Sequence, residues 1–145
     1  MPQADIIDIA DAIVNELNSQ TFNPPFTAVR GYLPTFDLPE MNELKVTVVP
    51  KEDDGKLDTR TQSTHDYAID IGIQKKPPTI DNNQLDPLML LTQQIADHFL
   101  FGKQAAGATL ISPSVRILYL QDHLQKLRQF TSVVTLTLRG WRQAA

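Results

Sequence analysis

The fold is decided by one stretch of the chain, Thr64-His65-Asp66-Tyr67-Ala68-Ile69-Asp70-Ile71-Gly72-Ile73-Gln74. Large apolar side chains alternate in it with polar or small ones, and a period of two residues is the pattern of a β-strand with one buried face. The apolar face holds Tyr67, Ile69, Ile71 and Ile73. We predict that this face packs in the core, and that the opposite face, with Asp66 and Asp70, meets water or another polar surface.

Further strand patterns lie on both sides of this stretch. Before it come residues 27–32 and a half-buried strand at 44–48, which Pro50 ends. After it come residues 115–120 and 130–138, the second of which is rich in β-branched side chains. These patterns predict a sheet of four to five strands.

Two amphipathic helices complete the pattern. The first begins with Asp5 as its N-cap, and the second begins with Asp86 as N-cap and Pro87 at the first helical position. Gly102 is the expected stop of the second helix. The apolar stripes are Ile6, Ile9, Ala10, Ile13 and Leu17 in the first helix and Leu88, Leu91, Ile95 and Phe99 in the second. The order predicts an α+β fold, with a mixed or antiparallel sheet and both helices packed on one face.

The chain reads as a single domain, residues 1–145, with a long polar hairpin loop at about 50–64. The loop contains Asp53-Asp54-Gly55, which is a turn signal, and it lacks the large apolar groups that a core needs. We expect such a loop to serve contacts with other molecules. The segment 121–128 is compatible with either a wide turn or a short helical turn.

The bulk composition excludes several classes of function. The net charge is -4, with a sequence pI near 5.2, which argues against a general nucleic-acid binder. The chain has no cysteine, so disulfides and thiolate chemistry are excluded. No signal peptide is visible at the N-terminus, and no apolar run approaches the ~20 residues of a membrane helix. We expect a soluble protein without a membrane partner, made in the cytoplasm.

A search for reaction chemistry finds no site. The histidines His65, His98 and His123 share no metal-ligand spacing, and Asp66 and Asp70 lie about 13 Å apart along a strand, too far to share a proton. The serines have no evident base or oxyanion partner in the sequence; the candidates considered are Ser63, Ser112, Ser114 and Ser132. We therefore expect no enzymatic activity, no catalytic residue, no metal and no cofactor.

The charged and aromatic residues indicate contact surfaces instead. A basic bias marks the last third of the chain, at Arg116, Lys126, Arg128, Arg139 and Arg142, near Tyr119 and Trp141. These residues fit a nucleic-acid groove or a face complementary to an acidic neighbour, and we favour the second reading. Tryptophan and arginine are common interface anchors. The predicted interface residues are Glu52, Asp53, Asp54, Asp58, Arg60, Asp66, Asp70, Arg128, Arg139 and Trp141.

Three segments carry a resemblance to a known family. They are the strand 64–74, the helix that follows Asp86-Pro87 and reads Leu90-Leu91-Thr92-Gln93-Gln94-Ile95, and the strand Arg128-Gln129-Phe130-Thr131-Ser132-Val133-Val134-Thr135-Leu136-Thr137-Leu138. Together they resemble the tail terminator and tail completion proteins, or head-tail joining proteins, of long-tailed bacteriophages. The similarity spans the chain from the first helix to Trp141, and the order of elements resembles that family's α-β-β-β-α-β-β plan.

The resemblance implies a structural role in the virion. The expected assembly is a hexameric ring at the head-proximal end of a tail, which stops polymerisation of the tail-tube protein and docks to the head-neck connector. The resemblance also places the polar hairpin at an interface and implies an acidic lumen, through which DNA passes without sequence-specific binding. Glu52, Asp53, Asp54 and Asp58 would line that lumen. The expected location is the virion tail or neck, after assembly in the host cytoplasm.

Three alternatives remain open at this level. Two belong to the same class: a neck stopper or head-completion protein, and a tail-tube subunit, which would polymerise alone. The third is a small metal-dependent hydrolase, for which His65 and Asp70 would be needed.

Overall fold

The computed structural model describes residues 3–22, 24–32, 43–100, 104–117 and 120–143, with only the backbone described at 104–105 and 112–117. The elements run along the chain in the expected order of helix, strands, helix and strands. They are α1 (Asp5–Ser19), β1 (Ala28–Arg30), β2 (Lys45–Leu57), β3 (Gln62–Lys75), α2 (Asn82–His98), β4 (Gln104–Ala105), β5 (Ala108–Ile117), η2 (His123–Leu127) and β6 (Phe130–Gln143).

The described strands form one six-stranded sheet in the order β1-β2-β3-β6-β5-β4. β1 runs parallel to β2, and every other neighbouring pair is antiparallel, so the sheet is mixed. The predicted α+β class is confirmed. The five longer strands agree with the predicted number, and the two-residue strand β4 adds a short hairpin at one edge.

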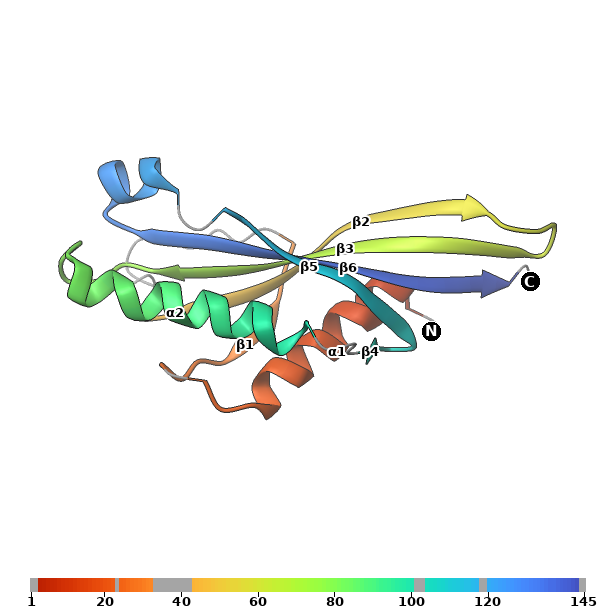
Figure 1. The fold of residues 1–145 in the computed structure, drawn as a ribbon, viewed down its shortest axis with the longest axis horizontal. Helices are drawn as coiled ribbons and strands as arrows, with labels where there is room; N and C mark the ends of the chain where they lie inside the picture. The colour runs from red at the N-terminus through yellow and green to blue at the C-terminus, as the bar shows by residue number, and fades with distance from the viewer. Residues whose placement is uncertain (1–2, 23, 33–42, 101–103, 118–119, 144–145) are drawn as a thin grey trace.

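Both helices pack on the same face of the sheet (Figure 1). The alternation predicted for 64–74 is confirmed, because Tyr67, Ile69, Ile71 and Ile73 are all buried in one apolar cluster with the helices. The predicted helix stripes are confirmed as well: Ile9, Ala10, Ile13 and Leu17 are buried in α1, Leu88, Leu91 and Ile95 in α2, Phe99 just after it, and Ile6 packs at the margin. The core therefore lies between the helices and the middle of the sheet.

Both predicted helix starts were wrong. α1 begins at Asp5 itself, after Ala4 as N-cap, so Asp5 lies in the first turn. α2 begins at Asn82, where the side chain of Asp81 accepts a hydrogen bond from the Gln84 N–H, and Pro87 lies inside the helix. Asp81, rather than Asp86, therefore caps the helix. Pro87 lies within the helix, where it has no N–H to donate to the carbonyl four residues earlier. α2 ends at His98, and Gly102 lies outside the described residues.

The predicted long loop at 50–64 is mostly strand. β2 continues to Leu57 and β3 begins at Gln62, so the connection is only 58–61. Pro50 does not end β2: the strand continues through a register shift between Pro50 and Glu52, and prolines are tolerated at bulges and on edge strands. Asp53, Asp54 and Gly55 are paired strand residues rather than a turn. The loop prediction was wrong because it relied on the polar composition of this segment. This part of the sheet does not face the core, so its strands need no alternation of apolar side chains.

The C-terminal strands are longer than predicted. β5 begins at Ala108 rather than Val115, and β6 continues past Leu138 to Gln143. Ahead of the predicted strand at 115–120, β4 and the start of β5 form a hairpin, whose turn residues Ala106 and Gly107 both have positive φ, as a type I′ turn requires. Of the two readings for 121–128, the helical turn is found: η2 is a short π-helix that ends at Arg128 in the left-handed conformation.

Candidate functional site

Three strands extend beyond the helices to form a projection that we call the blade. It consists of Lys51–Leu57 of β2, Gln62–Ala68 of β3 and Thr137–Gln143 of β6, and it points to the right in Figure 1. Cross-strand pairing runs without a break along it, from Glu52↔Ala68 to Leu57↔Ser63 and from Ala68↔Thr137 to Gln62↔Gln143. Every residue from Lys51 to Thr61 is exposed. Backbone hydrogen bonds, rather than burial, therefore hold the β2 segment of the blade in its extended form.

The blade has two chemically different faces, because successive strand residues point to opposite sides. Its helix-side face continues the core face of the sheet. The residues of this face are Asp53, Gly55, Leu57, Ser63, His65, Tyr67, Leu138, Gly140 and Arg142. Its outer face is the opposite one and carries Glu52, Asp54, Lys56, Thr64, Asp66, Arg139 and Trp141.

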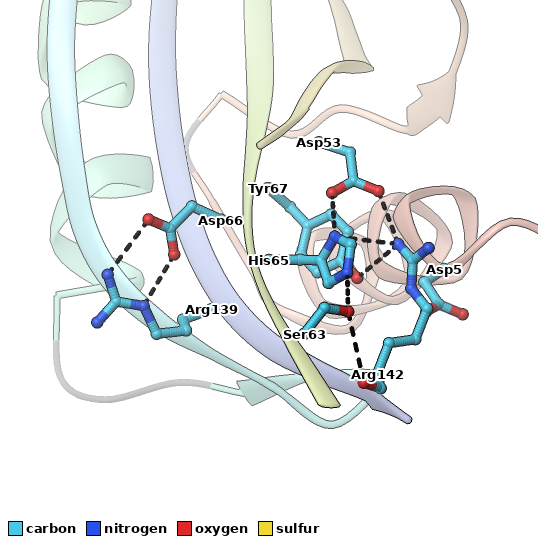
Figure 2. A network of polar contacts seen from close by, with 8 residues as sticks. All are labelled: Asp5, Asp53, Ser63, His65, Asp66, Tyr67, Arg139 and Arg142. Carbon is cyan, nitrogen blue, oxygen red and sulfur yellow. Dashed lines mark hydrogen bonds and ion pairs between the residues drawn. The ribbon is translucent and has the colours of Figure 1, made fainter. Parts of the chain in front are cut away.

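A polar cluster on the helix-side face joins the blade to α1 (Figure 2). Arg142 is its centre: its Nε lies 2.9 Å from the Asp5 carboxylate, and its Nη2 lies 2.7 Å from the Asp53 carboxylate. The same Nη2 donates to the Tyr67 hydroxyl at 3.2 Å. One guanidinium thus ties together the first turn of α1, β2 and β3, where the apolar core ends.

His65 is held between two partners in this polar cluster. Its Nδ1 lies 2.6 Å from Asp53 Oδ1 and its Nε2 lies 2.7 Å from Ser63 Oγ. Because a carboxylate only accepts, Nδ1 carries a hydrogen, and in that tautomer Nε2 can accept from the serine hydroxyl. The ring stacks on Tyr67, and Gly55 lies opposite it, where an added Cβ would come to 2.7 Å from the ring. Glycine at position 55 is what leaves room for the imidazole.

The electrostatics of the polar cluster favour its charged state. Partial burial by itself would raise the pKa of Asp53, but the hydrogen bonds from His65 and Arg142 outweigh it, so the pKa lies below the usual value. The hydrogen bonds to Tyr67 and Asp53 raise the pKa of Arg142. Asp53 is therefore ionised and Arg142 charged at neutral pH.

The order Ser63, His65, Asp53 has the hydrogen-bond distances of a nucleophile, a base and an orienting carboxylate. The prediction that Ser63 lacks a base was therefore wrong, because cross-strand and same-strand neighbours supply one. Two features work against nucleophilic use. Arg142 shares the charge of Asp53, and the Arg142 carbonyl, 3.4 Å from Ser63 Oγ, competes with His65 for the single hydroxyl hydrogen.

The outer face carries a separate ion pair. Arg139 donates to both carboxylate oxygens of Asp66, at 2.8 and 3.2 Å. These hydrogen bonds lower the pKa of Asp66 below its usual value. Trp141 stands beside this pair with about half of its surface exposed, 54%. A large exposed aromatic ring next to charged side chains is a typical anchor of a protein contact.

The structure gathers most of the predicted interface residues, but not all. Glu52, Asp53, Asp54, Asp66, Arg139 and Trp141 lie on the blade, and Asp58 and Arg60 lie in its terminal turn. Asp70 lies on the outer side of β3 above the core, where it accepts from Thr135 and pairs with Lys51. Arg128 follows η2 at the opposite end of the sheet, so it cannot share a surface with the others.

The basic residues of the last third do not form one groove. Arg139 and Arg142 point to opposite faces of the blade, and each is paired with a carboxylate. Lys126 and Arg128 are exposed near η2, at the far end. Tyr119 and the side chain of Arg116 lie outside what the structure describes. The paired arginines fit the reading as a protein-contact surface better than a nucleic-acid groove.

The histidines are held separately, as the sequence predicted. His98 binds Glu16 at 2.8 Å, and His123 binds Thr131 at 2.8 Å, both far from His65. Among the residues that the structure describes, no group of three or more potential ligands could hold a metal ion.

Sequence reasoning missed most of the polar cluster. Asp5, Ser63, His65, Tyr67 and Arg142 were not among the predicted interface residues. One signal was present: Ser63, His65 and Tyr67 are spaced by two, so they share a face of any strand through them. The partners Asp5 and Arg142 come from the two ends of the chain, and nothing in the sequence pairs them.

In the described part of the chain, no helix has both the length and the apolar character needed to cross a bilayer. No protein-family model and no curated protein sequence matches this chain.

Proposed function

We propose that this protein is a non-enzymatic virion component that assembles into a ring at the head-proximal end of a phage tail. The observation that supports this best is the blade. It extends the sheet beyond the helices, only its base contributes residues to the core (Tyr67 and Leu138), and all of its β2 segment is exposed. A structured, exposed extension of this kind supports a role in contacts between proteins.

The blade carries the features of a contact surface. Leu57 at its tip is 78% exposed, and Trp141 is half exposed. Ordering an exposed strand costs conformational entropy that burial does not repay in the monomer. The polar cluster at Arg142 nevertheless keeps the blade in a fixed orientation relative to α1. Pre-ordering of this sort lowers the entropy cost when a partner binds.

The mechanism of a ring terminator follows from symmetry. Each subunit joins the next through two different patches, and a rotation that closes on itself fixes the number of copies, a hexamer by the resemblance. One face of the ring binds the last ring of the tail-tube protein. The other face accepts no further tube subunit and docks to the neck connector. Glu52, Asp54 and Asp58 are exposed acidic groups that would repel DNA passing through the lumen.

The test is particle mass by light scattering, first for the protein alone and then with a tail-tube protein. We expect a defined ring mass and tubes that stop growing when the protein is added. Trp141→Ala should weaken assembly, whereas Leu90→Ala, which removes an equally exposed apolar side chain from α2, should not. A protein that stays monomeric at high concentration and leaves tube growth unchanged would contradict the proposal.

The same experiment separates the two related functions. A tail-tube subunit would form long tubes without any added protein. A neck stopper or head-completion protein would bind the connector but leave tube growth unchanged. Neither behaviour is expected of a terminator.

A second function is supported by the Ser63–His65–Asp53 geometry. An activated Ser63 would react covalently with a fluorophosphonate probe, losing its proton to His65 as the phosphorus–oxygen bond forms and fluoride leaves. Labelling of the wild type but not of Ser63→Ala would support a hydrolase. We expect no labelling, because Arg142 shares the charge of Asp53 and the Arg142 carbonyl competes with His65 for the hydroxyl hydrogen of Ser63.

A further inference from the structure

The outer edge of β2 is paired with β1 before Pro50 and is open after it. β1 pairs with Val46, Thr47 and Val48 only, and from Pro50 to Leu57 no described strand lies on that side. All residues from Lys51 to Thr61 are exposed, so no described side chain covers this edge. The blade therefore presents a length of open strand edge to solvent.

The hydrogen bonds at the hairpin turn show which backbone groups this edge offers. The Asp58 N–H donates to the Gln62 carbonyl, so Asp58 and Gln62 form a hydrogen-bonded pair. Such pairs alternate along an antiparallel ladder, which directs the backbone groups of Glu52, Asp54 and Lys56 towards β3. The N–H and C=O groups of the intervening residues point outward, and these residues are Asp53, Gly55 and Leu57.

This edge is complementary to itself. In an antiparallel pairing with a two-fold axis at Gly55, Gly55 faces Gly55 of the second copy, and Asp53 faces Leu57 of the second copy. All of these residues point their N–H and C=O groups outward, so each pair can exchange both backbone hydrogen bonds. Between them, Asp54 faces Lys56 of the second copy, and the axis repeats this pair of opposite charges. Cross-strand pairs of opposite charge stabilise a sheet, and like charges destabilise it.

We propose that a second copy of this chain binds the β2 edge in this register. The contact is isologous, since the same residues serve on both sides. It does not rest on the proposed ring, whose neighbours meet through two different patches. The paired segment is short, so the dimer forms only at high protein concentration.

The opposite edge of the sheet is a poorer template. β5 carries Pro113, which has no N–H, and two register shifts, between Leu110 and Ser112 and between Val115 and Ile117. Bulges and prolines are devices that block pairing at sheet edges. The β2 edge has Pro50 and one bulge, both at its start, and then a regular ladder to Leu57. This contrast favours β2 pairing with β2 over a β2–β5 contact.

Disulfide cross-linking tests the register directly, because the chain has no cysteine of its own. Positions 54 and 56 face each other at a non-hydrogen-bonded pair, where Cα atoms lie about 4.5 Å apart, within the range of a disulfide. We expect a mixture of Asp54→Cys and Lys56→Cys proteins to form a covalent dimer under mild oxidation. Neither variant alone should do so, because identical positions are offset in this register.

Charge reversal tests the same contact without a covalent bond. Asp54→Lys or Lys56→Asp places like charges together twice, and each should weaken dimerisation about tenfold in sedimentation velocity. Mixing these two variants, or combining both changes in one chain, should restore wild-type affinity. Asp97→Lys and Lys126→Asp make the same charge changes at exposed positions elsewhere and should have no effect.

Three results would overturn the proposal. The first is a wild type that remains monomeric at millimolar concentration. The second is cross-linking of Lys56→Cys to Ile111→Cys, an exposed position on β5, in preference to Asp54→Cys. The third is an Asp54→Lys variant that dimerises as well as the wild type. None of these depends on whether rings form, so failure here leaves the proposed function to its own test.

Discussion

The two ends of β3 show how differently one strand can be stabilised. Ile69, Ile71 and Ile73 are completely buried under the helices, and their positions follow from apolar alternation. Ser63 and His65 continue the same face into the blade, where their hydrogen bonds to each other and to Asp53 replace apolar packing. The comparison teaches that a continuous sheet need not have a continuous core.

The energies of the two ends differ accordingly. Burying one isoleucine side chain contributes about 1.5–3 kcal/mol, whereas one hydrogen bond contributes about 0.5–1.5 kcal/mol net. The blade therefore has a lower local stability than the helix-covered half. Regions of low local stability and high exposure are those that proteins use for contacts.

The largest expected effect is a truncation in the covered half. Ile71→Ala should lower the free energy of unfolding by about 2–5 kcal/mol, because it leaves a cavity in a packed core. Leu57→Ala on the blade should cost less than about 0.5 kcal/mol, since the side chain is exposed. Urea denaturation measures both. Equal losses would show that the blade is as well packed as the core.

A methyl group added at Gly55 should disturb the blade without touching the core. The new Cβ would meet the His65 ring at 2.7 Å, so the ring must move and its bond to Asp53 weakens. We expect Gly55→Ala to cost about 1–2 kcal/mol in the wild type. The cost should disappear in a His65→Ala background. A cost that persists there would place its origin in the backbone rather than in the ring.

The two faces of the blade can be compared through their arginines. Arg142→Gln removes the bonds to Asp5 and Asp53, and we expect a loss of about 1 kcal/mol, reduced from the buried value because the side chain is half exposed. Arg139→Gln on the outer face should have a smaller effect, since Arg139 bonds one carboxylate, whereas Arg142 bonds two carboxylates and the Tyr67 hydroxyl. Hydrogen exchange should show faster opening at β2 residues 51–57 in Arg142→Gln alone. Identical exchange rates in the two variants would show that the polar cluster does not hold the β2 segment of the blade in place.

The smallest expected effect is a dependence on pH that is confined to the blade. Asp53 and Asp66 both have folded pKa values below the usual 3.8, because hydrogen bonds from His65, Arg142 and Arg139 favour their carboxylates. Their contribution to the free energy of unfolding is fully present above the usual pKa and is lost as the pH falls through the lowered pKa values. Asp53→Asn should flatten this fall in urea denaturation curves recorded at successively lower pH below 3.8, whereas Asp54→Asn serves as the control that keeps the fall.

The helix-covered half of the sheet could be predicted from the sequence, and the blade could not. In the covered half, alternation in 64–74 and the helical stripes identified the core residues, because burial imposes a period on the sequence. In the blade, Lys51–Leu57 was read as a loop, because exposed strand residues need no apolar period. Pro50 and Asp53-Asp54-Gly55 strengthened that error, since both are usually found in turns.

The sequence by itself determined the α+β class, the buried face of β3 and the apolar stripes of both helices, because these depend only on spacing along the chain. Only the tertiary structure decided that Arg142 meets Asp53, which is 89 residues away, and Asp5. Such contacts depend on strand order and register, which place β3 between β2 and β6 and align their ends. Register is a property of whole strands packed together, so no local pattern at position 142 encodes its partners.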